Sequence, residues 1–428
     1  MTIRLLYLTR EPHPSFRPDL LTLFGRCLPR YGVQSDIVAL GAPAVAASST
    51  GPATPSWQGG TAHTRSGRGS IGRLRARLRA AFDLFGLARS GAYDAVQVRD
   101  RIGGALIGLL AARWSGVPFF YWMSFPFPDL WRQMGDAAGE GASLTPAKRR
   151  LWRWRGLLAS FVLYRLVLPR ADHLFVQSDA MAALLAAKGL PRARMTPVPM
   201  GVEMPADVDA VAPSDDVRLQ GRRVLAYLGT LERIRHPEVM VHAMADVVRT
   251  APDALLLLVG DSPMAGERAW LEQEIARLGL QQHVIVTGWL APADAWRYLR
   301  AASIGLSPFP RTPILEVASP TKVCEYLAYG VPVVANDQPD QAALIAATGG
   351  GLCVPLTAAG FADGMLALLG DPQRAQAMAA SGRAAIGRLR SYDVLAASLA
   401  DTYRRLLPHA ARQTDAVPMP SAPPRAEP

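Results

Sequence analysis

The chain has 428 residues, of which half are apolar and 19% are charged, and its formal net charge is +11 at pH 7. This length and composition predict two folded domains, each with its own core, and exclude a largely disordered chain. The three cysteines, Cys27, Cys324 and Cys353, show no metal-ligand spacing, so the sequence argues against a cysteine metal site and indicates a reducing compartment.

The positive charge is confined to the first half of the chain. Residues 1–205 contain 26 Lys and Arg against 12 Asp and Glu, whereas the remaining residues contain 20 against 23. This imbalance predicts an anionic partner for the first half, namely lipid headgroups, nucleic acid or an acidic substrate. We expect no signal peptide, because Met1 leads directly into an apolar run. The longest apolar stretch, 156–169, is too short to span a bilayer, so we expect a cytoplasmic protein.

The first half of the chain reads as alternating strands and helices. We expect strands at 3–9, 36–40, 94–99, 119–124 and 173–177, and helices at 15–29, 72–91, 102–114 and 179–188, the last capped by Ser178. Residues 42–72 are rich in Ala, Ser, Thr, Gly and Pro and predict a flexible surface excursion. Strand, helix, strand with short joints is the parallel crossover unit.

Ligands of parallel sheets bind beyond the carboxyl ends of the strands. In the first half these ends are the loops 9–13, 99–101 and 124–128. The candidate residues for an acceptor or a sugar in these loops are Arg10, His13, Arg99 and Ser124. His13 lies in a turn between two prolines, where a structural role is the commoner one.

Two stretches of the first half combine cations with apolar residues. Arginines alternate through 73–79, and basic residues alternate with tryptophan and leucine through 148–161. Tryptophan favours the headgroup level of a membrane and arginine reaches phosphates, so both stretches predict contact with an anionic membrane surface. The alternative is a solvated helix end or a core helix with a basic end. No nucleic-acid-binding motif accompanies the arginines, so we expect no nucleic-acid partner.

A polar linker at 206–221 precedes a second α/β series. We expect its strands at 223–228, 255–259, 284–287, 304–306 and 333–336, and its helices at 237–249, 267–278, 292–301, 372–389 and 394–406. The last helix should return to the first domain. Residues from about 411 are rich in Pro, Ala and Ser and predict a disordered tail.

The stretch 307–336 carries the chemistry we expect of the second half. Ser319 is a predicted cap and Pro320 a predicted first-turn residue of a helix that Gly330 ends. Lys322 would lie in its first turn and add a full charge to the open amides, which suits a phosphate. Glu325 would share its face and accept hydrogen bonds from hydroxyls.

The segment SPTKVCEYLAYGVPVVANDQPD resembles the nucleotide-sugar-binding segment of retaining glycosyltransferases with the GT-B fold. The resemblance implies that Glu325 contacts the ribose. It also implies that an acidic residue eight positions earlier contacts the donor sugar, but position 317 is Val, and Glu316 is the nearest carboxylate. The segments RMTPVPMGVE and GTLERIRHPEVMVHAM are also similar to this family.

In the second segment the resemblance implies that Arg235 is a cation for the donor diphosphate, with Lys322 as the other. The catalytic candidates are Arg235, Lys322 and Glu325, and the candidates for donor binding are Gly229, Thr230, Thr287, Gly288, Trp289, Leu290, Glu316, Ser319, Pro320 and Thr321. The resemblance thus implies two Rossmann-like domains, an acceptor-binding one at 1–205 and a nucleotide-sugar-binding one at 218–390, and a helix at 391–410 that crosses back.

The implied function is transfer of a sugar, with retention, from a UDP- or GDP-sugar to a saccharide or lipid-linked acceptor. Cell-surface polysaccharide or glycolipid assembly is the implied setting. We expect no cofactor and no metal, because no Asp-x-Asp or His cluster follows a strand. One alternative is a nucleotide-sugar epimerase of the same fold, with Glu11, His13, Asp100 and Asp129 as acid/base candidates. The other is a non-catalytic subunit that binds the nucleotide sugar.

Overall fold

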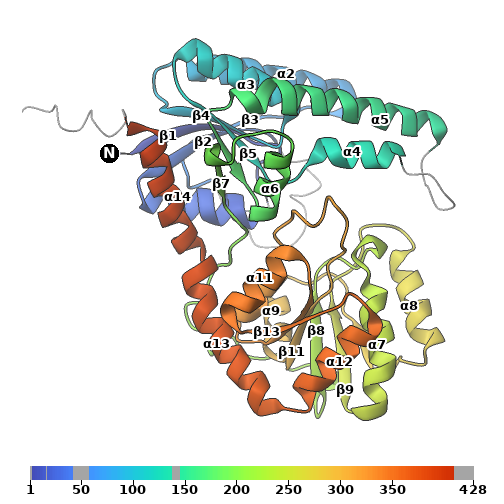
Figure 1. Ribbon diagram of the computed structural model, residues 1–428. Helices are drawn as coiled ribbons and strands as arrows, with labels where there is room; N and C mark the ends of the chain where they lie inside the picture. Colours follow the sequence, from blue (N-terminus) through green and yellow to red (C-terminus); the bar gives the residue numbers. More distant parts are fainter. Residues whose placement is uncertain (1, 16, 42–56, 137–144, 409–428) are drawn as a thin grey trace, which may run out of the picture.

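The computed structural model describes residues 2–15, 17–41, 57–136 and 145–408 as two α/β domains, each built on a parallel sheet (Figure 1). The first sheet has seven strands in the order β3-β2-β1-β4-β5-β6-β7. Their bounds are β1 Ile3–Leu8, β2 Val33–Leu40, β3 Ala62–Arg65, β4 Ala95–Arg99, β5 Phe119–Met123, β6 His173–Val176 and β7 Met195–Pro197. The central strands are buried along their whole length, as expected for a parallel sheet covered on both faces.

Helices cover both faces of this sheet. A π-helix, η1, spans Asp19–Cys27 and is followed by the short α1, Leu28–Arg30. The others are α2 Gly69–Ala88, α3 Ile102–Ser115, α4 Phe127–Asp136, α5 Pro146–Ser160, the π-helix η3 Phe161–Val167 and α6 Asp179–Ala187. Ser178 caps α6 as predicted, because its Oγ accepts a hydrogen bond from the Met181 amide at 3.0 Å. Among the described residues, no helix has the length and apolar character needed to cross a bilayer.

The expectation of a flexible excursion at 42–72 is wrong for its second part. Residues 57–65 add the edge strand β3 to the sheet, in parallel with β2. Trp57 anchors the approach, since its indole N–H donates to the Ser35 carbonyl at 2.8 Å, and the Thr61 amide donates to Asp36 at 2.7 Å. These partners lie more than 20 residues away in sequence, so local composition does not reveal them. Residues 42–56 and the predicted tail from 411 lie outside the described residues.

The second sheet has six strands in the order β10-β9-β8-β11-β12-β13. Their bounds are β8 Arg223–Leu228, β9 Ala254–Val259, β10 Val284–Val286, β11 Ile304–Ser307, β12 Val333–Asn336 and β13 Gly351–Val354. The helices are α7 Pro237–Thr250, α8 Glu267–Arg277, α9 Pro292–Arg300, α10 Lys322–Ala328, α11 Pro339–Thr348, α12 Ala358–Leu369, α13 Pro372–Arg390 and α14 Tyr392–Leu406. The elements follow the predicted order, and both sheets are Rossmann-like, so the predicted fold class is confirmed.

The last two helices connect the domains, as predicted for the end of the chain. Figure 1 shows α13 along the second domain and α14 continuing upward against the first. The Tyr403 hydroxyl on α14 donates to Gln97 of β4 at 2.6 Å, and both side chains are buried. The chain passes between the domains twice, and the two passages pair through a bridge between Val202 and Ser391.

The buried Tyr326 hydroxyl ties α10 to the second sheet. It accepts a hydrogen bond from the Leu228 amide at 2.9 Å and donates to the Leu306 carbonyl at 3.2 Å. Tyr326→Phe should lower the free energy of unfolding by about 1–3 kcal/mol, because the Leu228 amide is then buried without a partner. Chemical denaturation measures the change. Tyr31→Phe, at a half-buried position, is the control, and equal stability of the two variants would contradict the assignment.

Candidate active site in the interdomain cleft

Two cavities lie between the domains. The strand-edge cavity, of about 860 Å³, is lined by loops that follow β1, β5 and β6 of the first sheet and β8 and β11 of the second. The hinge cavity, of about 700 Å³, is lined by η1, residues 201–206 and side chains of α9 and α10. Pro18 lines both, so the two cavities are neighbouring parts of one cleft. Ligands of parallel sheets bind at such edges.

The loop after β8 brings a glycine against a lysine. Gly229 has a φ of +150°, and a Cβ there would lie 3.1 Å from Nζ of Lys322. The Lys322 ammonium also lies over the Tyr227 ring, 5.0 Å from its centroid. A side chain at position 229 would crowd the Lys322 ammonium, and the positive φ favours glycine there. The backbone carbonyl of the next residue, Thr230, accepts a hydrogen bond of 3.1 Å from the Tyr227 hydroxyl.

The two predicted cations differ in their partners. Lys322 has no carboxylate within 4.0 Å in the part of the chain that the structure describes. Arg235 lines the strand-edge cavity, and its Nε lies 3.3 Å from Glu232. Arg235 lies near the end of the loop that starts at Gly229 after β8, and Lys322 lies on α10 next to Gly229. Lys322 is thus unpaired but lines neither cavity, whereas Arg235 is partly neutralised and lines the strand-edge cavity.

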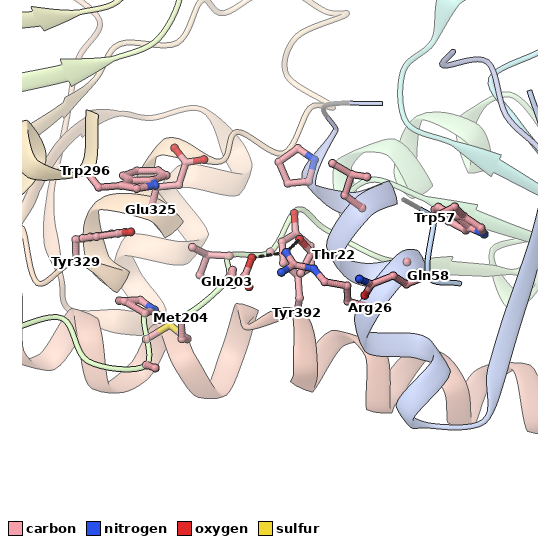
Figure 2. A pocket seen from close by; sticks show the side chains of 17 residues that line it. Thr22, Arg26, Trp57, Gln58, Glu203, Met204, Trp296, Glu325, Tyr329 and Tyr392 are labelled. Atoms are coloured by element: carbon pink, nitrogen blue, oxygen red, sulfur yellow. Dashed lines mark hydrogen bonds and ion pairs between the residues drawn. The ribbon is translucent and has the colours of Figure 1, made fainter. Parts of the chain in front are cut away.

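Glu325 faces the hinge cavity. Figure 2 shows it beside Trp296 and Tyr329, whose rings stack at 4.7 Å and 15°. Burial raises the pKa of the Glu325 carboxyl, and the Lys322 charge and a hydrogen bond with Thr321 oppose that rise. The far wall of the same cavity carries Arg26 of η1, which pairs with Glu203 of the hinge at 2.6 Å. A hydroxyl-rich ligand could thus meet a carboxylate and an aromatic pair.

The predicted start of the α10 helix is wrong by two residues. The helix begins at Lys322, and Thr321 precedes it without a side-chain cap. The Ser319 hydroxyl has other partners, because it accepts from the Met200 amide at 3.0 Å and donates to Asp340 at 2.7 Å. Pro320 and Thr321 nevertheless line the strand-edge cavity. Ser319 thus joins the second domain to the hinge, where Arg390 also binds Asp340 at 2.7 Å.

Position 317 belongs to the domain contact. Val317 is buried in the apolar core of the first domain, and its carbonyl accepts the Ser178 hydroxyl at 2.6 Å. Glu316 does not line either cavity, because Arg311 holds its carboxylate at 2.8 Å on the surface. The structure thus does not bring Glu316 to the place where a donor sugar was expected to meet it.

Val317→Glu should open the two domains. The new carboxylate would be buried beside Ser178 with no cation, at a cost of several kcal/mol, so the contact would separate to hydrate it. Small-angle X-ray scattering should show a larger radius of gyration than for the parent chain. Glu316→Gln, which alters only an exposed ion pair, should leave it unchanged. An unaltered radius for Val317→Glu would show that this contact does not hold the domains together.

The four first-domain candidates occupy different environments. Arg99 is fully buried and pairs with Asp19 at 2.5 Å, so it is not available to an acceptor. His13 packs against Trp57 away from the strand-edge cavity, and burial lowers its pKa. Ser124 lines that cavity, and its hydroxyl donates to the buried Asp100. Arg10 is exposed and lies 3.6 Å above the Phe127 ring.

Four donor-binding candidates that follow β10 do not line either cavity, namely Thr287, Gly288, Trp289 and Leu290. The Thr287 hydroxyl accepts from the Gly260 amide at 3.3 Å, and Gly288 turns the chain with a φ of +77°. Trp289 is 59% exposed, and Leu290 packs against the core between the second sheet and α10. Trp289 alone of the four thus presents a large free surface.

Two cavity residues were missed as ligand contacts. Glu11, considered only for an epimerase, lines the strand-edge cavity with Arg99 at 3.5 Å from its carboxylate. Gln177 lines the same cavity, and its buried Oε1 has no hydrogen-bond partner. Gln177 directly follows β6 and Glu11 lies in the loop after β1, and that position was the available signal. Within the described ranges, no group of three His, Cys, Asp or Glu side chains could hold a metal ion.

Two family models match the chain, one for each domain. Residues 22–201 match the glycosyl transferase 4-like domain, and residues 222–371 match glycosyl transferases group 1. Together they span most of the chain.

Relatives found by sequence similarity are also named as sugar-transferring enzymes. The putative teichuronic acid biosynthesis glycosyltransferase TuaH of Bacillus subtilis is 27% identical over 59% of this chain and 64% of its own length. The alpha-monoglucosyldiacylglycerol synthase of Streptococcus pneumoniae is 29% identical over 28% of this chain and 25% of its own length. The chain therefore spans less than two thirds of these relatives.

Solved structures share the fold over nearly the whole chain. HepE of Anabaena, determined with UDP, superposes with a TM-score of 0.65 at 17% identity, covering 94% of this chain and 100% of that one. Sucrose-phosphate synthase of Thermosynechococcus elongatus gives 0.69 at 17% identity, covering 96% and 100%. At 17% sequence identity, these superpositions show a shared fold only.

Proposed function

Because its two domains match glycosyltransferase family models and adopt the GT-B fold, we propose that this chain is a glycosyltransferase that transfers a sugar, with retention, from a nucleotide diphosphate sugar to an acceptor held by the first domain. The observation that carries the proposal is the unpaired Lys322 against Gly229, with Arg235 on the same loop. A UDP- or GDP-sugar is the proposed donor, and HepE is a structural neighbour determined with UDP-glucose.

The chemistry requires charge stabilisation at the diphosphate. Breaking the sugar–phosphate bond leaves a nucleoside diphosphate whose negative charge grows in the transition state. Lys322 and Arg235 are fixed cations that meet this charge without reorganising, in the role that a metal ion fills in other enzymes. Glu325, which faces the neighbouring hinge cavity, is the proposed acceptor for ribose hydroxyls.

The acceptor is proposed to be a saccharide or lipid-linked saccharide in cell-surface polysaccharide or glycolipid assembly. The names of the relatives, in teichuronic acid biosynthesis and in diacylglycerol glucosylation, support this class. The basic first half supports binding to the cytoplasmic face of an anionic membrane.

Incubation with a set of UDP- and GDP-sugars and saccharide or lipid-linked acceptors tests the proposal. The expected result is free nucleoside diphosphate and a glycosylated product with the anomeric configuration of the donor, which NMR reports. An epimerised donor would point to the isomerase, which is disfavoured because Asp129 is bound by Lys188 at 2.9 Å and His13 lies against Trp57. Donor binding without turnover would indicate a non-catalytic subunit.

A further inference from the structure

Four arginines from separate parts of the first domain gather beside the cleft. Arg10 follows β1 and Arg101 follows β4, at the carboxyl edge of the sheet, while Arg77 lies on α2 and Arg155 on α5. We call them the arginine cluster. Arg10 precedes Glu11 and Arg101 follows Asp100, whose partner Ser124 lines the strand-edge cavity as Glu11 does. Arg10 and Arg101 are therefore sequence neighbours of residues at the strand-edge cavity, although none of the four arginines lines it.

A row of aromatic rings holds two members of the cluster. The Arg10 guanidinium lies 3.6 Å from the centre of the Phe127 ring, and the Arg155 guanidinium lies 4.1 Å from that of Trp131. The Phe127 and Trp131 centroids are 6.4 Å apart, so the rings bring the two cations to one surface. Trp152 extends the row, with Arg155 4.8 Å from its centre. The flat faces orient the guanidiniums without neutralising them.

No carboxylate neutralises the cluster within the described ranges of the chain. None of its four arginines forms an ion pair within 4.0 Å, and Nη1 of Arg101 is buried without a hydrogen-bond partner. The acids nearby are already engaged, because Asp129 binds Lys188 at 2.9 Å and Asp136 binds Arg153 at 3.4 Å. A buried guanidinium without a counterion destabilises the free protein, so its position favours a ligand that supplies the negative charge.

The charges of the cluster act on one another's pKa values. Burial, and after it the Arg77 charge, lowers the pKa of Arg101 to about 10. Burial, followed by Arg10 and Arg77, lowers the pKa of Arg155. The repulsion among these groups is a cost that a dianion would remove.

The surface next to the cluster is apolar and exposed. Helices α2, α3 and α5 form the outer layer of the first domain, on the side away from the second (Figure 1). Large apolar side chains project from it, among them Leu74 and Leu78 of α2, Leu110 of α3, and Trp154 and Leu158 of α5, each more than half exposed. Basic residues on the same helices complement an anionic lipid surface.

We propose that the arginine cluster binds the phosphate or diphosphate group of a lipid-linked acceptor, whose apolar chain lies along α2, α3 and α5 and whose sugar enters the strand-edge cavity. The inference rests on the proposed function and names its acceptor class. A phosphate needs several donors in a compact arrangement, and planar guanidiniums supply them in pairs. Free phosphate would satisfy the same donors, so the test must separate the two sources.

Vesicle binding tests the proposal without donor or turnover. Phosphatidylcholine vesicles, alone or with polyprenyl diphosphate, are sedimented with the full chain, and inorganic pyrophosphate is titrated separately. The double variant Arg10→Gln/Arg155→Gln should lower the affinity for the polyprenyl diphosphate vesicles about tenfold, the effect of one charge-assisted contact or more. The control Arg73→Gln/Arg153→Gln removes two charges from α2 and α5 outside the cluster and should change it less than about twofold.

Three outcomes would overturn the proposal. Equal losses in the two double variants would show that only diffuse charge matters. Equal binding of the parent chain to both kinds of vesicle would remove the lipid phosphate as the ligand. Pyrophosphate binding as tight as that of the polyprenyl diphosphate would assign the cluster to a soluble anion. Failure of UDP to bind the parent chain would instead refute the proposed function, which these vesicle assays do not measure.

Thermal stability distinguishes a ligand role from a structural one. Arg101→Met keeps the side-chain volume and removes the buried unpaired charge, so without ligand its melting temperature should exceed that of the parent chain. Its affinity for polyprenyl diphosphate vesicles should fall about tenfold. A lower melting temperature would mean that Arg101 supports the fold, and the proposal would lose its central residue.

Discussion

Lys322→Ala should lower kcat for sugar transfer by about 10²–10³, the effect of removing one fixed group that stabilises developing charge. It should also weaken binding of the donor diphosphate by about 1–3 kcal/mol, the range of a charge-assisted contact. The ammonium has no carboxylate within 4.0 Å among the described residues and lies over the Tyr227 ring, so its charge is not offset by an ion pair. Initial rates against donor concentration, with UDP titrations, measure both effects.

Arg235→Ala should cost less in kcat than Lys322→Ala. Glu232 lies 3.3 Å from the Arg235 guanidinium and already offsets part of its charge. Arg233→Ala is the matched control, because Arg233 is on the same short turn but lies over the Trp270 ring at 4.3 Å. Unchanged kcat and UDP affinity in Lys322→Ala would remove the β8 loop from the mechanism, whatever the control shows.

The strands and most helices could be predicted from the sequence because their signals are local. Val224 to Leu228 and Leu255 to Val259 are apolar runs bounded by turn residues, and the structure buries both. The β3 edge strand has no such signal. Its partner strand β2 lies in another part of the chain, as do Ser35 and Asp36, which bind the residues just before β3. A polar, glycine-rich stretch therefore became a strand only through pairing.

The candidate site could be predicted less completely, for the same reason. The Ser319 hydroxyl could cap a helix, but it instead accepts a hydrogen bond from the Met200 amide and donates one to the Asp340 carboxylate. The sequence also gave no means of knowing that Val317 enters the core of the other domain. Lys322 does lie in the first turn of its helix, as the local sequence predicted, but its closeness to Gly229 comes from the packing of α10 against the sheet and was not predicted.

Asp19→Asn should lower the free energy of unfolding by about 3 kcal/mol, at the lower end of the range for breaking a buried ion pair. Asp19 and Arg99 are both almost fully buried, 2.5 Å apart. The loss stays near the lower end because Glu11, at 3.5 Å, still faces the Arg99 guanidinium. Urea denaturation at neutral pH measures it. Asp393→Asn breaks an exposed pair with Arg30 and should cost less than about 1 kcal/mol.

The Asp19–Arg99 pair also predicts that the free energy of unfolding falls as the pH is lowered below about 4. Burial would raise the pKa of Asp19, but the charges and hydrogen bonds of Arg99 and Arg17 outweigh it and lower the pKa to about 2. A carboxyl with a lowered folded pKa stabilises the protein above its unfolded pKa of about 4, and this stabilisation is lost as pH falls toward 2. Asp19→Asn should therefore lose stability less steeply than the parent chain between pH 4 and about 2.

Asp100 does not contribute to this loss of stability at low pH, because its pKa is raised whereas that of Asp19 is lowered. Burial raises its pKa to about 6, against the opposing charge of Arg99. Its contribution is complete below pH 4 and is lost as pH rises through about 6. Asp100→Asn should keep the steep loss below pH 4 that Asp19→Asn lacks. If both variants kept it, the Arg99 charge would be balanced mainly by Glu11, and the buried pair would not be what holds η1 to the end of β4.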